Sequence, residues 1–335
     1  MLKFPTTERT LLGGNRRRSL SRWPRKAGSP SAQARSPQRV TIWTCLTPMI
    51  HRYCVTHEKP LLPDSWYDTC IALGDFEPDS AFHVRQLDQF WHEARPIAYG
   101  AAGSHVLPIA IERSSDDAEL TEMCAYRKRI LPSPEGIESR IYPTMRELSL
   151  NDFGRKADLA VFTPTAGHDF LVAQPMRLRK PVVDHYAAIH HRRDIVDYAS
   201  LAVETGVLDA DSASDFLAAR YFIPGGVELG IFPTEWLVQV LSGIEIVGRE
   251  FLNRHGDRLR KYNTFQIRAV GFLTERLGSY FLVRHLTRKY LNNIPAEIFG
   301  YMTVIVEDNG NYSAGLADRP KSRSKWRKTK PKRAE

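Results

Sequence analysis

Short apolar runs separated by polar loops mark the first half of the chain after residue 48. The run over 51–56 predicts a buried strand, and Pro60 and Pro63 predict that the following loop is extended. A strand followed by a polar loop opens many α/β nucleotide-binding folds. Further elements are expected before residue 165: a helix over 82–95 ended by Pro96, a strand over 106–111, an apolar then basic segment over 119–130, and a buried strand over 158–163.

In the second half, apolar positions recur mostly every three to four residues, which is typical of helices that cover a core. Helices are predicted over 184–207, 211–220, 234–255 and 264–290. Residues 221–232 are apolar and contain Gly225 and Gly226, which predicts a strand, a turn and a second strand. A last strand is expected over 303–307. Together these elements predict an α/β domain with a helix-rich C-terminal half.

The charge is distributed unevenly along the 335 residues, whose formal net charge is +9. Residues 1–40 hold ten basic and one acidic side chain, and residues 317–335 hold nine basic and two acidic. The remainder therefore has 28 basic and 35 acidic residues, a net charge of −7. The sequence thus predicts three parts: a disordered basic segment over 1–48, a folded domain over 49–316, and a disordered basic tail over 317–335.

The first of these parts has two interpretations. Its Arg, Ser, Pro and Gly residues offer little apolar surface to bury, which favours a disordered leader. Met49 stands just before the first strand, so part of 1–48 could instead lie upstream of the native start. The four cysteines show no Cys-x-x-Cys spacing, which favours reduced thiols in the cytoplasm. No apolar run reaches the length of a membrane span.

Four stretches of the chain share residues with a known bacterial family. They are Thr56-His-Glu-Lys-Pro60, Met123-Cys-Ala-Tyr-Arg-Lys128, the histidines around 185–191 with Asp194, and Arg268-Ala-Val-Gly-Phe-Leu-Thr-Glu-Arg276. Over residues 50–285 the chain resembles a family of unknown function described as predicted exopolysaccharide or capsular-polysaccharide glycosyltransferases. Two features depart from it: Ala125 stands where the family usually has His, and Tyr99-Gly-Ala-Ala-Gly103 replaces an aromatic-rich helix.

This resemblance implies a GT-A-like fold that binds a nucleotide-sugar at the C-terminal edge of its strands, usually with a divalent cation. Carboxylates would hold Mg²⁺ or Mn²⁺, and Asp116 and Asp117 are the closest match to a metal-binding Asp-x-Asp. Acidic pairs after Ser-Ser also occur as helix caps, so both interpretations stay open. The candidate donor-binding residues follow two strands: Thr56, His57 and Lys59 after the first, and Tyr126, Arg127 and Lys128 in the basic segment.

Glu228 is the leading catalytic candidate, with Asp158 as a second. Gly225 and Gly226 would let the backbone approach a sugar acceptor closely, and Glu228 would be the base or an acceptor-binding carboxylate of an inverting transfer. A plain turn with an exposed Glu is the competing interpretation. Of the histidines, His190 is expected to reach the cleft. Glu275 and Arg276 are expected to be structural ion-pair partners.

The sequence therefore predicts a glycosyltransferase that adds sugars from a nucleotide-sugar to a surface polysaccharide or another glycan. It is expected in the cytoplasm, with peripheral contact to the anionic inner membrane through the basic tails. Two alternatives are a family member that has lost activity, as Ala125 suggests, and a polyanion-binding protein that acts through the tails. The acidic body argues against a specific nucleic-acid partner.

Overall fold

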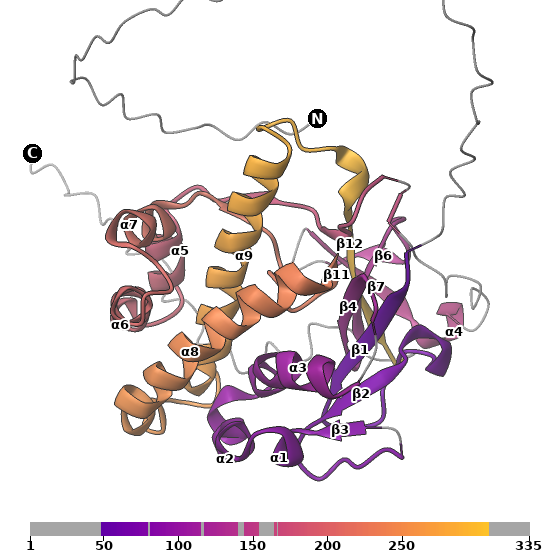
Figure 1. Ribbon diagram of the computed structural model, residues 1–335, viewed down its shortest axis with the longest axis horizontal. Coiled ribbons are helices and arrows are strands. Elements are labelled where there is room, and N and C mark those ends of the chain that lie inside the picture. Colours follow the sequence, from indigo (N-terminus) through magenta and orange to yellow (C-terminus); the bar gives the residue numbers. More distant parts are fainter. Residues whose placement is uncertain are drawn as a thin grey trace, which may run out of the picture. The chain divides into compact units, whose positions relative to one another are not determined.

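A computed structural model of the chain describes residues 48–79, 81–114, 117–139, 144–153, 164–165 and 167–307. In this part of the chain one large, mostly parallel sheet has the order β3-β2-β1-β4-β5-β12-β7-β6, with β11 beside β4 and β8 beside β12 (Figure 1). Its strands are β1 (Ile50–Thr56), β2 (Thr69–Ala72), β3 (Ala81–His83), β4 (Leu120–Ala125), β5 (Lys128–Leu131), β6 (Ile137–Glu138), β7 (Met145–Ser149), β8 (Val172–Ala173), β11 (Gly230–Pro233) and β12 (Phe299–Val306). A second sheet pairs β9 (Met176–Arg177) with β10 (Tyr221–Phe222).

The directions of β1, β4 and β11 define one edge of the sheet. β1 and β4 are parallel, with Ile50 opposite Leu120 and Val55 opposite Ala125. β11 is antiparallel to β4, so its first residue, Gly230, lies opposite Met123 near the end of β4. The ends of β1 and β4 and the beginning of β11 therefore lie at one edge of the sheet, which we call the carboxyl edge.

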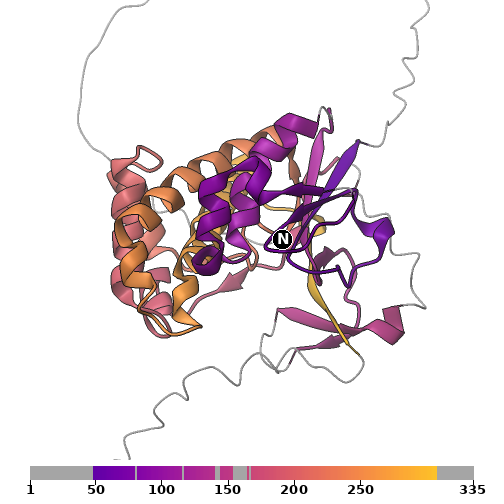
Figure 2. The same cartoon turned by 90° about the horizontal axis from the view of Figure 1, so that it is seen from below.

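Helices cover one face of this sheet (Figure 2). They are α1 (Val84–Leu87), α2 (Gln89–Ala98), α3 (Ala101–Ser114), α5 (Val182–Ala187), α6 (Arg192–Glu204), α7 (Ala210–Ala218), α8 (Thr234–Leu259) and α9 (Ala269–Lys289), with the short α4 (Leu150–Phe153) following β7. Helix α3 packs directly on β1, because Gly103 leaves room for Val55: a Cβ at Gly103 would lie 2.4 Å from Val55 Cγ1. α8 and α9 contact α3, and α6 lies beyond them against α8.

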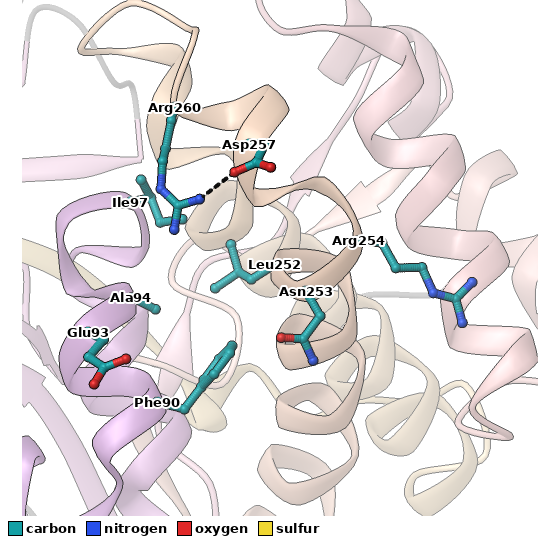
Figure 3. Close-up of a pocket in the computed structure, with 9 residues that line it drawn as sticks. All are labelled: Phe90, Glu93, Ala94, Ile97, Leu252, Asn253, Arg254, Asp257 and Arg260. Atoms are coloured by element: carbon teal, nitrogen blue, oxygen red, sulfur yellow. Dashed lines mark hydrogen bonds and ion pairs between the residues drawn. The ribbon is translucent and has the colours of Figure 1, made fainter.

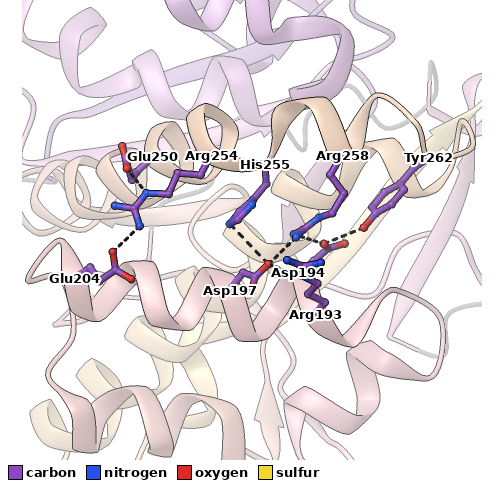
Figure 4. A network of polar contacts seen from close by, with 9 residues as sticks. All are labelled: Arg193, Asp194, Asp197, Glu204, Glu250, Arg254, His255, Arg258 and Tyr262. Carbon is purple, nitrogen blue, oxygen red and sulfur yellow. Dashed lines mark hydrogen bonds and ion pairs between the residues drawn. The ribbon is translucent and has the colours of Figure 1, made fainter.

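Ion pairs fasten α6 to α8 (Figure 4). Arg258 of α8 donates to Asp194 at 2.8 Å and to Asp197 at 2.7 Å. The Asp194 side chain is almost fully enclosed, and the hydroxyl of Tyr262 also donates to it at 3.2 Å. One turn earlier, Arg254 reaches the exposed Glu204 at 2.6 Å. The Asp194 carboxylate is enclosed and has Arg258 in place of water. The Arg258–Asp194 pair therefore contributes more to holding α6 against α8 than the exposed Arg254–Glu204 pair does.

The opposite face of the sheet buries a charged pair under an aromatic ring. Arg129 of β5 donates to both carboxylate oxygens of Glu122 on β4, at 2.5 and 2.6 Å. Trp66, in the 3-10 turn Asp64–Trp66, covers the guanidinium with its ring centroid 4.7 Å away. The predicted apolar then basic segment over 119–130 is therefore a hairpin of two strands. Its last basic residue is a core residue, because two hydrogen bonds and a carboxylate offset its burial.

The predicted strand over 106–111 is wrong, since these residues lie within α3. Helix α3 is enclosed between the sheet and α8 and α9, and Gly103 to Leu107 are all buried. A helix that is buried on most sides has no polar face, so its sequence lacks the helical period and resembles a core strand. Pro96 and Pro108 also lie inside α2 and α3 rather than at their ends.

Two predicted helices are interrupted. The expected helix over 82–95 begins as strand β3, and Asp88 then separates α1 from α2 by accepting a hydrogen bond from the Trp91 N–H at 3.3 Å. The expected helix over 184–207 divides into α5 and α6, because residues 188–191 turn the His190 ring toward Gln266, 3.0 Å away. The two strands expected over 221–232 exist as β10 and β11, but they belong to different sheets.

The other predicted elements agree with the structure: β1, α7, α8, α9 and β12 lie within a few residues of their expected bounds. The α/β fold class is therefore confirmed. Cys54 lies between Cys70 and Cys124 on neighbouring strands, and all three thiols are buried and free. No helix in the described ranges is long and apolar enough to cross a membrane. The predicted strand over 158–163 and both basic tails fall outside the described residues.

Candidate functional site

The loop after β1 and the hairpin after β4 meet at the carboxyl edge. The Tyr126 N–H donates to the Val55 carbonyl at 3.1 Å, and its carbonyl accepts from the Leu61 N–H at 2.7 Å. The ring of His57 contacts the Tyr126 ring edge-on, with centroids 4.9 Å apart. Thr56 is buried and Lys59 is exposed. The structure thus brings together the two loops from which the sequence predicts donor binding.

The loop over 223–229, which contains Gly225 and Gly226, packs on α9 and leads to the same edge. The Gly225 N–H donates to Glu275 Oε1 at 2.8 Å, and the Ile223 N–H donates to Ser279 Oγ at 2.7 Å. Gly226 has a φ of +52°, and a Cβ there would lie 2.6 Å from the carbonyl oxygen of Glu275. Only glycine can adopt this backbone conformation so close to the helix without strain. The loop is therefore held by the backbone and side chains of α9.

This arrangement places Glu228 among charged groups. The side chain is half-buried, and its Oε1 atom is enclosed without a hydrogen-bond partner among the described residues. Burial and the neighbouring Glu275 carboxylate raise the pKa of Glu228 to about 8, while a hydrogen bond from Ser104 and the charge of Lys128 act in the opposite direction. A carboxyl group with a pKa near the working pH can both accept and release a proton. The site therefore has the properties of an acid or base.

Lys128 connects the β4–β5 hairpin with Glu228. It follows the turn of the β4–β5 hairpin, opposite Ala125, and it interacts electrostatically with Glu228. Next to it, the Arg127 guanidinium lies 5.0 Å from the centre of the Tyr126 ring. Lysine and arginine side chains at such an edge offset the charge of a bound phosphate. Of the predicted residues, the carboxyl edge therefore gathers Thr56, His57, Lys59, Tyr126, Arg127, Lys128, Gly225, Gly226 and Glu228.

The predicted metal-binding residues are not among them. Asp117 is exposed and precedes Leu120, the first residue of β4, so it lies at the sheet edge opposite to Tyr126. The length of β4 separates the two edges by about 17 Å. Asp116 and Asp158 lie outside the described residues. Within the described ranges no group of three His, Cys, Asp or Glu side chains is arranged to hold a metal ion. Because Asp116 lies outside the described residues, the metal site that the resemblance implies stays a prediction.

His190 has a different environment from the one the sequence suggests. Its Nδ1 lies 3.0 Å from Gln266 Oε1, and its ring packs against Phe265 and Phe272 with centroid distances of 5.3 and 4.4 Å. Burial lowers the pKa of His190 to about 4, so the ring is neutral at pH 7. These contacts join the turn between α5 and α6 to the beginning of α9.

Three residues at or next to the site are missed or assigned differently by sequence reasoning. Ser104 lies in α3, which the sequence presents as a run of small residues, so no pattern marks it. Glu275 and Arg276 were expected to form ion pairs. Glu275 instead accepts from the Gly225 N–H, and the buried Arg276 stacks on Tyr186 with its guanidinium 4.9 Å from the ring centre. The Arg276 guanidinium also donates to the Phe272 carbonyl at 2.8 Å.

Comparisons with known proteins support the fold. Neither a known protein family nor a curated protein matches the sequence. A solved structure of the bifunctional glycosyltransferase WbbM, in its apo form, is similar with a TM-score of 0.51 and 13% sequence identity. The alignment covers 77% of this chain and 45% of that one, so this chain spans less than half of WbbM's length. The similarity shows that the two proteins share a fold.

Proposed function

We propose that this protein is a glycosyltransferase that moves a sugar from a nucleotide-sugar donor to a hydroxyl group of a surface polysaccharide or another glycan. The observation that carries the proposal is the Glu228 carboxyl group, whose enclosed oxygen has no partner in the described part of the chain and lies at the carboxyl edge. In open α/β sheets ligands bind at this edge. The fold shared with a glycosyltransferase supports the same class of reaction.

In this proposal the two loops at the carboxyl edge bind the donor. Lys128 and Arg127 offset the charge of the donor's diphosphate, and the rings of His57 and Tyr126 form a wall beside it. Thr56 and Lys59 belong to the same loop as His57. The acidic body of the protein makes this local set of cations necessary, because a diphosphate would otherwise be repelled.

Glu228 acts as the base in the transfer step. An acceptor hydroxyl oxygen attacks the anomeric carbon of the sugar, and the bond from this carbon to the diphosphate oxygen breaks with its electron pair. The hydroxyl proton passes to the Glu228 carboxylate, and the nucleoside diphosphate leaves as an anion beside Lys128. Gly225 and Gly226 carry no side chain, so the backbone before Glu228 can lie close to the acceptor. The sugar is transferred with inversion.

The expected Mg²⁺ or Mn²⁺ is given no step in this mechanism, because Asp116 and Asp158 lie outside the described residues. A divalent cation would contribute by neutralising the diphosphate. The requirement for Mg²⁺ or Mn²⁺ stays a prediction, tested by running each assay below with the added cation and again with EDTA.

The test uses the purified full chain with a panel of UDP- and GDP-sugars. We expect at least one donor to raise the melting temperature and to release nucleoside diphosphate when a glycan acceptor is added. Glu228→Gln should keep the donor-induced rise and lose the release, because the amide cannot take the proton. Glu204→Gln, an exposed change on α6, is the matched control and should behave as the wild type. A folded protein that responds to no donor would contradict the proposal.

Contact with the anionic inner membrane through the basic tails is a separate part of the proposal. Residues 317–335 carry nine basic side chains, and each basic residue near an anionic surface contributes about 1 kcal/mol. Sedimentation with vesicles that contain anionic lipid should retain the full chain at low salt, and a chain reduced to residues 49–316 should stay in solution. Equal binding of both chains would contradict this contact. The same experiment with RNA in place of the vesicles tests the alternative that the protein binds polyanions through its tails.

A further inference from the structure

A hollow of about 390 Å³ lies between α8 and α9, on residues that the proposed mechanism does not use. Trp236, Val240 and Phe281 contribute apolar side chains to it, and Val207 closes it from the connection between α6 and α7. Gly243 of α8 also lines it, and a Cβ at this position would lie 3.5 Å from Val207 Cγ1. A glycine inside a helix costs about 1 kcal/mol relative to alanine. Here it leaves space in the hollow.

The aromatic side of the hollow is held in place by stacking. Trp236 packs against Phe232 with a centroid distance of 5.9 Å and against His285 at 4.8 Å. Phe170 approaches the Trp236 ring edge-on at 5.5 Å. These contacts fix the indole without covering it completely, since Trp236 is only half-buried. A ring fixed in this way gives an incoming apolar group a surface that is already ordered.

Two arginines give the rim of the hollow positive charge, whereas burial lowers the pKa of His285 beside them and favours its neutral form. Arg284, His285 and Arg288 line it from α9, and no carboxylate does. Arg284 donates to the Ser212 hydroxyl at 2.9 Å, and its charge interacts with the Asp209 carboxylate. The Arg288 guanidinium is exposed and makes no ion pair with a described residue. The two arginines are four positions apart on one helix, so their side chains can approach the same ligand.

A second hollow on the helical side provides a comparison (Figure 3). It measures about 260 Å³ and also contains two arginines, Arg254 and Arg260. There, Arg254 pairs with Glu204 and Glu250, and Arg260 pairs with Asp257 at 2.8 Å. Glu93 adds a further carboxylate to its lining. Both arginines of this hollow therefore have carboxylate partners, whereas Arg288 between α8 and α9 has no ion pair with a described residue.

We propose that the hollow between α8 and α9 binds a phosphorylated ligand that carries an apolar or aromatic group. Arg288 and Arg284 meet the phosphate oxygens with the planar fork of donors that suits them. Trp236 and Phe281 pack against the apolar part. The volume lies at the lower end of the range of small-molecule sites, which are mostly apolar with a few polar groups. This site does not depend on Glu228 or on the donor loops.

Isothermal titration of the full chain tests the proposal with three probes: inorganic phosphate, phenyl phosphate and hexyl phosphate. We expect both organic phosphates to bind at least about tenfold more tightly than inorganic phosphate, because only they reach the apolar floor. Tighter binding of phenyl phosphate points to an aromatic ligand, and tighter binding of hexyl phosphate points to a lipid-like one. Both results support the site. The donor loops also offer cations to a phosphate, so binding is assigned to this hollow by its loss in Arg288→Gln rather than by the titration of the wild type alone.

Arg288→Gln should raise the dissociation constant of each organic phosphate by about tenfold or more, as expected for a lost hydrogen bond to a charged group. Arg260→Gln, which removes an exposed arginine from the second hollow, is the matched control and should leave the affinity unchanged. The proposal is overturned if no probe binds at millimolar concentration, if Arg288→Gln binds like the wild type, or if inorganic phosphate binds as tightly as the organic phosphates.

Discussion

The backbone N–H of Gly225 donates a hydrogen bond of 2.8 Å to Oε1 of Glu275. This bond ties the loop before β11 to the middle of α9 and keeps the Glu275 carboxylate close to Glu228. The proximity has an energetic consequence, because two carboxyl groups in a partly enclosed site resist simultaneous ionisation. The same contact therefore positions the loop and sets the proton affinity of its catalytic candidate.

Glu228 should destabilise the folded protein at alkaline pH. Its pKa is raised from 4.5 to about 8, so the folded state binds more protons than the unfolded state between these values, and stability falls as pH rises through this window. Glu228→Gln removes the titration and should increase the free energy of unfolding at pH 8.5 by about 1 to 3 kcal/mol. The two proteins should differ little at pH 4.5. Urea unfolding at both pH values measures this, and an equal difference at both would contradict the raised pKa.

The transfer rate should increase with pH around the pKa of Glu228. A base must be ionised to accept a proton, so kcat/KM should rise as pH increases through about 8 and then level off. Glu275→Gln removes the neighbouring charge while its amide oxygen can still accept from Gly225. The rise should then move to lower pH, by about one unit for each 1.4 kcal/mol of repulsion removed. A pH profile that is identical in the wild type and Glu275→Gln would exclude this coupling.

Two glycines of α9 should respond oppositely to substitution by alanine. A Cβ at Gly278 would lie 2.8 Å from Val227 Cγ2, whereas a Cβ at Gly271 would have its nearest neighbours at 3.7 Å. Gly278→Ala should therefore displace the loop that carries Glu228 and destabilise the protein by about 1 to 3 kcal/mol. Gly271→Ala should stabilise it by up to about 1 kcal/mol through helix propensity. Thermal unfolding compares the two, and a less stable Gly271→Ala would show that Gly271 has a role beyond packing.

The buried ion pair between α6 and α8 should contribute more to stability than the exposed one. Arg258→Met leaves Asp194 enclosed with only the Tyr262 hydroxyl as a side-chain donor, and should cost about 3 kcal/mol. Arg254→Met removes contacts to the exposed Glu204 and to Glu250, and should cost much less stability than Arg258→Met. Denaturant unfolding of both variants at pH 7 checks the order. Equal losses would show that the Asp194 carboxylate is not truly desolvated.

His105 should contribute to the loss of stability in acid. It is buried between Trp91, with which it stacks at 4.1 Å, and Thr274, and burial lowers its pKa from 6.5 to about 3. The unfolded state therefore binds the extra proton between these values, so stability falls as pH decreases below 6.5, by up to about 1.4 kcal/mol per pH unit.

His105→Gln keeps a polar group in that position but cannot be protonated. The variant should lose less stability than the wild type between pH 6.5 and 4.5, as measured by urea unfolding. His191→Gln, a change at an exposed histidine, should follow the wild type. If both variants lose stability in parallel with the wild type, His105 is not the residue that senses acid.

Elements with a clear apolar run or period could be predicted from the sequence. The strands β1 and β12 are continuous buried runs, and the apolar positions of α8 and α9 recur every three to four residues, which together led to the α/β class. Such prediction fails for α3, whose burial on most sides removes the period. The division of 184–207 at residues 188–191 is also absent from the pattern, since it depends on the contact of His190 with Gln266, 76 residues away.

The same distinction applies to the candidate site. The sequence alone determined that a flexible Gly-Gly turn precedes a carboxylate at Glu228, and that polar and basic residues follow two strands, because these are properties of neighbouring residues. Only the tertiary structure decided which of them meet. The direction of β4 in the sheet puts Tyr126 at the carboxyl edge and Asp117 at the opposite one, and the packing of α3 and α9 brings Ser104 and Glu275 to Glu228. Strand direction and helix packing arise from contacts between residues that are distant in the chain, so no local pattern encodes them.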